Sequence, residues 1–214
     1  MGDEAIHYYQ HLFRLLGTVF LHEPTAAFLQ SLKTGELFNV WPEERLSHNI
    51  ERGIKLLKTY FFRWTPVEME ELRLDYTRLF IGLDHCCAPP VESVYLSRDH
   101  LMFEEQTRQL RQLYKEYGLE VAALHRIPDD HIGYQFLFIS RLLTFLSEEL
   151  HSSPKNHNKV YSALKTILNS HLSLWIKDFY DRVQTHSCTD FYRGMGELAV
   201  GGIEQLSAWT TLTS

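Results

Sequence analysis

Apolar residues recur at helical spacing along almost the whole chain. Ile6, Tyr9, Phe13, Leu16 and Phe20 form the first such stripe, and steps of three and four residues place side chains on one face of a helix. No segment keeps the alternation of apolar and polar residues that is typical of a half-buried strand, and no internal repeat is present. The pattern predicts an all-α fold, a single globular helical bundle of about eight helices.

Turn and cap residues divide the first half of the bundle. Pro24 ends the first helix, and residues 26–32 make a short second helix. A third helix is expected to start at Pro42 and to run past Phe61, because proline suits the first helical turn. The segment Thr65-Pro66-Val67-Glu68 predicts a fourth start, with a cap residue, a proline and a carboxylate near the positive helix end.

The second half contains a joint. Ser97 is expected to cap a fifth helix that Gly118 stops, and Asp129 or Asp130 to cap the sixth. Two further helices are expected over residues 157–185 and 189–211. The organisation is therefore an N-terminal segment 1–118, a hinge 119–130 and a C-terminal segment 131–214, all within one domain.

Composition excludes several classes of protein. The net charge of −6 disfavours a nucleic-acid partner. No window approaches the roughly 20 apolar residues of a membrane span, and the first residues, MGDEAIHYYQHLF, lack the basic start of a secretory signal. Three cysteines, two of them adjacent, argue against a disulfide framework and favour a cytoplasmic location.

Two stretches carry the most functional information. One is Tyr76 to Ser97 (YTRLFIGLDHCCAPPVESVYLS), and the other is Pro128-Asp129-Asp130-His131. Together they resemble the peptide-binding signature of the TorD/DmsD family of cytoplasmic redox-enzyme maturation chaperones. The C-terminal part adds similar pieces in the same order: His171-Leu172, Trp175, Phe179, Phe191-Tyr192-Arg193 and Gly196-Glu197-Leu198-Ala199.

The resemblance implies a function without catalysis. It implies a chaperone that binds the twin-arginine signal peptide, and the apo form, of a molybdoenzyme catalytic subunit such as a DMSO- or TMAO-reductase-like protein, and that delays export until the cofactor is inserted. No cofactor and no stable membrane insertion are expected. The resemblance also implies a monomer that can exchange its C-terminal helices through the hinge to form a domain-swapped homodimer.

Tyr76, Leu79 and Phe80 share one helix face. Periodicity alone favours core packing for them. The resemblance implies a second role, because family members place a tryptophan, a leucine and a phenylalanine here, on the wall that receives the signal peptide.

Asp130 and His131 match the Asp-His pair of the family's hinge motif, and Asp129 is the variable position beside them. Carboxylates are natural bidentate partners of the guanidinium groups that a twin-arginine segment presents. The candidate arginine acceptors are Asp75, Asp84, Glu92, Asp129 and Asp130. The alternative is that Asp130 only caps a helix and that His131 is an ordinary first-turn residue.

The loop from Pro89 to Tyr95 resembles the family's proline-rich Glu-Ser-Val-aromatic loop, so Glu92 and Ser93 join the candidate peptide-binding residues. Prolines fix an extended backbone. A structural role, as a rigid crossover, is favoured over direct contact with the peptide.

Two other functions are less well supported. The run His85-Cys86-Cys87 offers metal ligands, but neighbouring residues rarely reach one tetrahedral ion together, and no metal is expected. An enzyme could use Cys86 or Cys87 as nucleophile with His131 as base, yet no motif of a defined reaction accompanies them. A generic helical adaptor protein is the remaining alternative.

Overall fold

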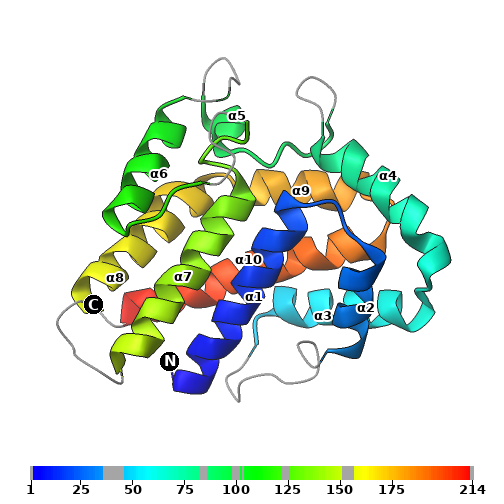
Figure 1. Ribbon diagram of the computed structural model, residues 1–214, viewed down its shortest axis with the longest axis horizontal. Helices are drawn as coiled ribbons and strands as arrows, with labels where there is room; N and C mark the ends of the chain where they lie inside the picture. The colour runs from blue at the N-terminus through cyan, green and yellow to red at the C-terminus, as the bar shows by residue number, and fades with distance from the viewer. Residues whose placement is uncertain are drawn as a thin grey trace.

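The computed structural model describes residues 2–35, 46–81, 86–97, 102, 104–121, 126–150 and 157–212 of the 214 residues. Within them the fold is all-α, as predicted, and is built from ten α-helices (Figure 1). These are α1 (Asp3–Leu21), α2 (Ala26–Thr34), α3 (His48–Arg63), α4 (Met69–Phe80), α5 (Glu92–Leu96), α6 (Glu105–Glu116), α7 (Ile132–Leu150), α8 (His157–Lys165), α9 (Ile176–His186) and α10 (Asp190–Leu212).

Three short helices of other types join them. A 3-10 turn, η1 (Pro66–Glu68), leads into α4, and its capping box, in which Thr65 and Glu68 bond each other's backbone, confirms the predicted start. A π-helical segment, η3 (Thr166–His171), and a 3-10 turn, η4 (Leu172–Leu174), separate α8 from α9. The single helix predicted over residues 157–185 is therefore interrupted.

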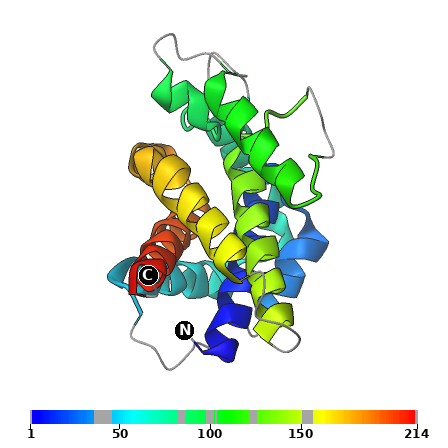
Figure 2. The ribbon, with the colours of Figure 1, turned by 90° about the vertical axis from the view of Figure 1, so that its left-hand side faces the viewer.

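Two long helix pairs form the centre of the bundle. Helix α1 packs along α7, and α3 packs along α10 (Figures 1 and 2). At the first crossing Gly17 faces Gly133, and a Cβ added to either residue would lie 2.9 Å from the carbonyl oxygen of the other. The absence of side chains at these two positions lets the backbones of α1 and α7 approach closely. Helix α7 follows the predicted hinge, so this contact connects the two predicted segments.

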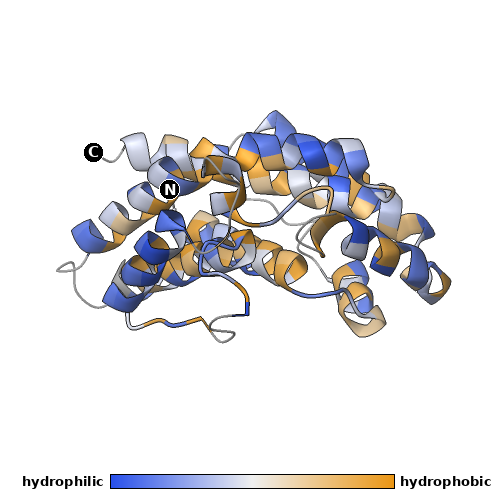
Figure 3. Ribbon diagram, turned by 90° about the horizontal axis from the view of Figure 1, so that it is seen from above, coloured by the Kyte–Doolittle hydropathy of each residue, from blue (hydrophilic) through white to orange (hydrophobic). Residues whose placement is uncertain are grey.

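The aromatic residues fill one continuous core. The ring of Phe20 from α1 lies 5.5 Å from those of both Phe80 and Phe179, and 6.0 Å from that of Phe136 on α7. Apolar and polar residues alternate in stripes along the helices (Figure 3), as amphipathic packing requires. None of the described helices is both long and apolar enough to span a bilayer.

Two helix starts differ from those predicted. Helix α3 begins at His48, capped by Ser47, and Pro42 lies outside the described residues. Ser97 ends α5 instead of starting the next helix, and α6 begins at Glu105. Gly118, by contrast, takes the predicted left-handed turn after α6, with φ of 68°.

Candidate functional site

The two stretches singled out in the sequence lie side by side. Val91 and His131 form an antiparallel bridge, the amide of Ile132 donates to the carbonyl of Pro90 (2.8 Å), and the amide of Glu92 donates to the carbonyl of Asp130 (3.2 Å). The proline-rich crossover is therefore bonded to the start of α7. This junction forms the base of the candidate site.

Asp130 is fully buried and links three segments. Its Oδ2 accepts a hydrogen bond from the amide of Ser93 (2.8 Å), and its Oδ1 accepts one from the hydroxyl of Thr107 on α6 (2.5 Å). The expectation that Asp130 caps its own helix is wrong, because its carboxylate caps the first turn of α5 instead. The start of α7 is bonded by His131, whose Nδ1 accepts from the amide of Gly133 (3.1 Å).

Glu92 lies beside Asp130, fully buried, in a chain of hydrogen bonds. Its Oε1 is 2.9 Å from Nδ1 of His171 in η3, and its Oε2 accepts from the side-chain Nε2 of Gln135 on α7 (2.9 Å). Gln135 also donates to the carbonyl of Asp130 (3.0 Å). Burial raises the pKa of Glu92, and the bonds to His171 and Gln135 oppose that rise.

We call Glu92, Asp130, Gln135 and His171 the hinge cluster. It connects α5, the end of the predicted hinge, α7 and η3. Two buried oxygens at this place have no hydrogen-bond partner within the described residues: Oε1 of Gln135 in the cluster and Oγ of Ser93, the residue after Glu92. Buried polar groups are rarely left so, which marks this region as a candidate for function.

Asp129 already binds an arginine. Nε of Arg111 lies 3.2 Å from both oxygens of Asp129, and Nη2 lies 2.7 Å from Oδ2. The carboxylate is almost entirely buried, and Tyr114 donates to the main-chain oxygen of Asp129 (3.0 Å). The arginine acceptor that was expected for a partner is thus occupied by a side chain of α6.

Tyr76, Leu79 and Phe80 are buried in the core, with exposed fractions of 5%, 0% and 5%. Phe80 lies 5.3 Å from the ring of Tyr192, and burial raises the pKa of Tyr76 to about 12. In this conformation the three side chains pack against other helices, so they do not form an open wall. Their contact with a peptide stays a prediction.

The remaining candidates are the acidic residues Asp75 and Asp84 and the run His85-Cys86-Cys87. Asp75 is buried and bonded to the start of α10, whereas Asp84 and His85 lie outside the described residues. Cys86 and Cys87 are half-buried free thiols. Burial raises the pKa of Cys86, which disfavours the thiolate that a nucleophile needs. No group of three or more metal-ligating side chains occurs among the described residues.

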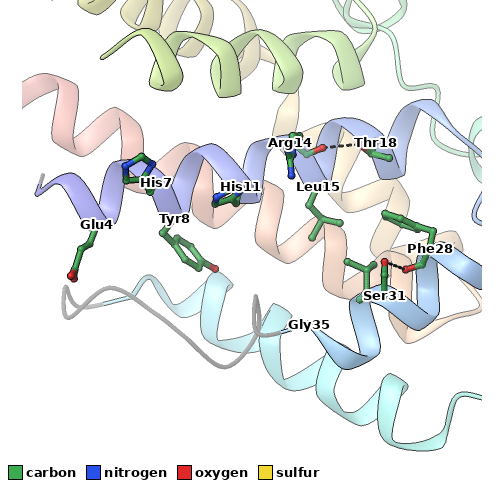
Figure 4. Close-up of a pocket in the computed structure, with 11 residues that line it drawn as sticks. Glu4, His7, Tyr8, His11, Arg14, Leu15, Thr18, Phe28, Ser31 and Gly35 are labelled. Atoms are coloured by element: carbon green, nitrogen blue, oxygen red, sulfur yellow. Dashed lines mark hydrogen bonds between the residues drawn. The ribbon is translucent and has the colours of Figure 1, made fainter. Parts of the chain in front are cut away.

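A cavity of about 670 Å³ opens between α1 and α2 (Figure 4). His7, His11 and Arg14 lie along its α1 side, and Phe28 and Ser31 project from α2. None of the residues predicted to bind a peptide lines it.

Four residues that bond the predicted site residues were not among the candidates from the sequence. Thr107, Arg111 and Gln135 carry no local signal, because only the folded chain brings them to the hinge. His171 was visible within the resemblance as part of His171-Leu172, but nothing in the sequence placed it beside Glu92. The π-helical turn that positions it breaks the helical spacing on which the prediction relied.

Comparison with known proteins gives consistent matches. The family model described as nitrate reductase delta subunit matches residues 43–181. The Tat proofreading chaperone DmsD of Salmonella typhimurium is 28% identical over 190 residues, which cover 87% of this chain and 82% of the relative. The chaperone protein YcdY of Escherichia coli is 28% identical over 200 residues, 91% of each chain.

More distant matches agree with these. The chaperone protein TorD of Shewanella pealeana is 22% identical over 207 residues, 92% of this chain and 87% of the relative. A solved structure of a redox enzyme maturation protein from Archaeoglobus fulgidus superposes with a TM-score of 0.51 at 18% identity, covering 96% and 94% of the two chains. The structural match shows a shared fold.

Proposed function

The chain belongs to the nitrate reductase delta subunit family, and on that premise we propose that it is a chaperone for the twin-arginine signal peptide of a molybdoenzyme catalytic subunit. In this role it holds the leader, and the apo form of the client, until the cofactor is inserted. The names of its relatives, Tat proofreading chaperone DmsD and chaperone protein TorD, support this function. The role requires no chemistry by the chain itself and places it in the cytoplasm.

The observation that carries the proposal is the junction of the two signature stretches. Residues of the proline-rich loop and of the hinge are far apart in the sequence, yet they bond each other directly through Val91 and His131 and through Glu92 and Asp130. Burial of polar side chains costs desolvation free energy that apolar residues of similar size would not cost. The stability of a helical bundle therefore does not require this buried polar set, which favours a functional role for it.

The leader is proposed to bind at this junction, against a surface supported by Tyr76, Leu79, Phe80, Glu92, Ser93, Asp129, Asp130 and His131. All eight side chains are buried here. Direct contact with the peptide therefore requires the hinge to move. If the hinge does not move, these buried residues contribute to binding indirectly, because they hold in place the exposed groups that contact the peptide.

The hinge also supports the proposed exchange of helices between protomers. Helices α7 and α10 bury apolar faces against α1 and α3 of the N-terminal segment. A second protomer can supply the same partners, so a domain-swapped dimer buries equivalent surface. Residues 122–125 of the hinge lie outside the described part of the chain.

Titration calorimetry with a synthetic twin-arginine leader tests the function. Burial of three or four aliphatic side chains, less the cost of ordering the peptide, predicts a dissociation constant of roughly 1 μM. A peptide of the same composition in scrambled order is the control. Equal affinity for both peptides, or no heat from either, would contradict a leader-specific chaperone and favour the adaptor alternative.

A further inference from the structure

Exposed apolar side chains concentrate in one part of the surface. Of the five large apolar side chains that are exposed among the described residues, four belong to residues 62–81: Phe62 (87%), Val67 (87%), Leu74 (62%) and Ile81 (54%). Figure 1 shows this part of the chain, the end of α3 and helix α4, at the right-hand edge of the molecule. Single exposed apolar residues are normal, whereas a group of them on neighbouring elements marks a contact surface.

Three of these side chains form a stripe along one helix face. Val67, Leu74 and Ile81 follow one another at intervals of seven residues, which is close to two helical turns. Val67 lies in η1, which leads directly into α4, and Ile81 is the C-terminal cap of α4. The buried side chains of Tyr76 and Leu79 lie on the other side of the helix. We call Val67, Leu74 and Ile81 the α4 stripe, which faces away from the core.

Charged residues occupy the same face in a defined order. Glu70 and Glu71 lie in the first turn of α4, and Arg78 lies in its last turn. Glu70 and Arg78 are each four residues from Leu74, so they flank it along the stripe. Neither glutamate forms an ion pair within the described residues. The face therefore has a negative start, an apolar centre and a positive end.

Contacts within the chain hold the two arginines of this face. Nε of Arg73 pairs with the carboxylate of Glu23 (3.0 Å). Nη2 of Arg78 donates to Oδ1 of Asp75 (2.8 Å) and to the carbonyl of His186, and the arginine side chain is 43% exposed. A guanidinium group has five N–H donors, so Arg78 is fixed at the surface and keeps donors for a carboxylate of a partner.

This order of residues is complementary to itself. When two α4 helices pack antiparallel with Leu74 at a two-fold axis, Val67 of each copy meets Ile81 of the other, and Glu70 meets Arg78. Each of these contacts then occurs twice, as in any two-fold interface. Parallel packing would instead bring the same charges together, which is unfavourable.

We propose that the α4 stripe is the surface on which a second copy of this chain docks, as an antiparallel pair of α4 helices with Leu74 at its centre. A different protein would need the same apolar spacing and the reverse order of charges, and a second copy supplies both. This dimer is distinct from the domain-swapped one, because its formation requires no opening of the hinge.

The size of the surface sets the strength of the dimer. One helix per protomer provides a small interface, of the class below about 1,200 Å² that transient complexes use. We expect a dissociation constant of roughly 0.1 mM and rapid exchange with the monomer. The monomer fraction from size-exclusion chromatography is the material for each test, so that a slowly exchanging swapped dimer does not contribute.

Sedimentation equilibrium over roughly 10 μM to 1 mM protein measures the association. Leu74→Asp places two carboxylates against each other at the axis and should raise the dissociation constant at least tenfold. Leu174→Asp, at another exposed leucine in η4, is the matched control and should leave the constant unchanged. Circular dichroism checks that both variants are folded. A wild type that stays monomeric over this range, or equal constants for the wild type and Leu74→Asp, would overturn the proposal.

A pair of charge substitutions tests the contact between Glu70 and Arg78. Glu70→Lys and Glu51→Lys, the latter at an exposed position of α3, each raise the net charge of −6 by two. Both variants reduce the overall repulsion between copies, but only Glu70→Lys faces Arg78 of the second copy. We expect weaker association for Glu70→Lys and equal or stronger association for Glu51→Lys. Stronger association for both would exclude the antiparallel charge pair.

Cross-linking tests the direction of the two helices. Val67→Cys and Ile81→Cys, mixed and mildly oxidised, should form a disulfide between positions 67 and 81 of different copies, which mass spectrometry of the linked peptides identifies. Each variant alone should form far less of the link between identical positions. Links between identical positions that exceed the mixed link would contradict antiparallel packing and overturn the proposed interface.

Discussion

The carboxylate of Asp75 on α4 accepts hydrogen bonds from both the amide (2.9 Å) and the hydroxyl (2.7 Å) of Thr189, 114 positions later in the chain. It also accepts from the amide of Cys188 and the hydroxyl of Ser187. Asp75 thereby fixes the turn before α10 to α4. Asp75 was a candidate acceptor for a leader arginine, but its carboxylate already accepts several hydrogen bonds within the fold.

Asp75→Ala should therefore destabilise the protein. Removal of the carboxylate leaves several buried donors unpaired, and we expect the free energy of unfolding to fall by about 3 kcal/mol. Urea denaturation measures the change. Asp181→Ala, exposed on α9, is the control and should change the value by less than about 0.5 kcal/mol. Similar effects of the two substitutions would contradict a structural role for Asp75.

Leu79 tests how the helix face of α4 is used. Leu79→Ala should cost about 2–5 kcal/mol of stability, because the side chain is completely buried. Leu74→Ala on the same helix should cost less than about 0.5 kcal/mol, since Leu74 is 62% exposed. Denaturation of both variants provides the test. A Leu79→Ala protein as stable as Leu74→Ala, with weaker leader binding, would instead indicate an open groove.

Local sequence patterns predicted several of the helices and two of their ends. Helical spacing identified α1, α2 and α4 and the buried side of each, because local patterning reflects which face meets the core. Cap chemistry located Thr65 and Gly118 correctly. The family was also recognisable, since its motifs are runs of neighbouring residues.

The sequence could not show which distant residues meet at the hinge cluster. Asp130 is a good helix cap by local rules, but its carboxylate bonds Ser93, 37 positions earlier. The pairing of Glu92 with His171 depends on a π-helical turn that no local pattern indicated. Peptide-binding roles were therefore assigned to side chains that the fold buries.

His131 makes a pH-dependent contribution to stability. Burial lowers its pKa from 6.5 to about 3, and the nearby His22 contributes. Because the unfolded state binds a proton near pH 6.5 and the folded state does not, this contribution is fully present above pH 6.5 and falls as the pH falls toward 3, by at most about 1.4 kcal/mol per pH unit.

Denaturation of the wild type and His131→Asn between pH 4 and pH 7 isolates this effect. Asparagine keeps an acceptor for the amide of Gly133 but does not titrate. The stability difference between the two proteins should shrink as the pH falls. The comparison is needed because Glu92, with its raised pKa, acts in the opposite direction. His48→Asn, exposed on α3, is the control, and a difference independent of pH would contradict the buried neutral imidazole.

The hinge predicts two slowly exchanging forms. Separation of α7 and α10 from α1 and α3 exposes much of the core, so a monomer and a domain-swapped dimer should interconvert slowly. Size-exclusion chromatography should show a main monomer and, after concentration, a dimer that persists on dilution. Re-equilibration within seconds of dilution would instead indicate ordinary surface association.

Hydrogen exchange measured by mass spectrometry, with and without a saturating Arg-Arg leader, tests the central claim most directly. The account predicts slower exchange on binding in four segments around the hinge cluster, residues 92–97, 105–116, 126–131 and 166–171. Unchanged exchange in these segments, or protection confined to the cavity between α1 and α2, would contradict leader recognition at the hinge.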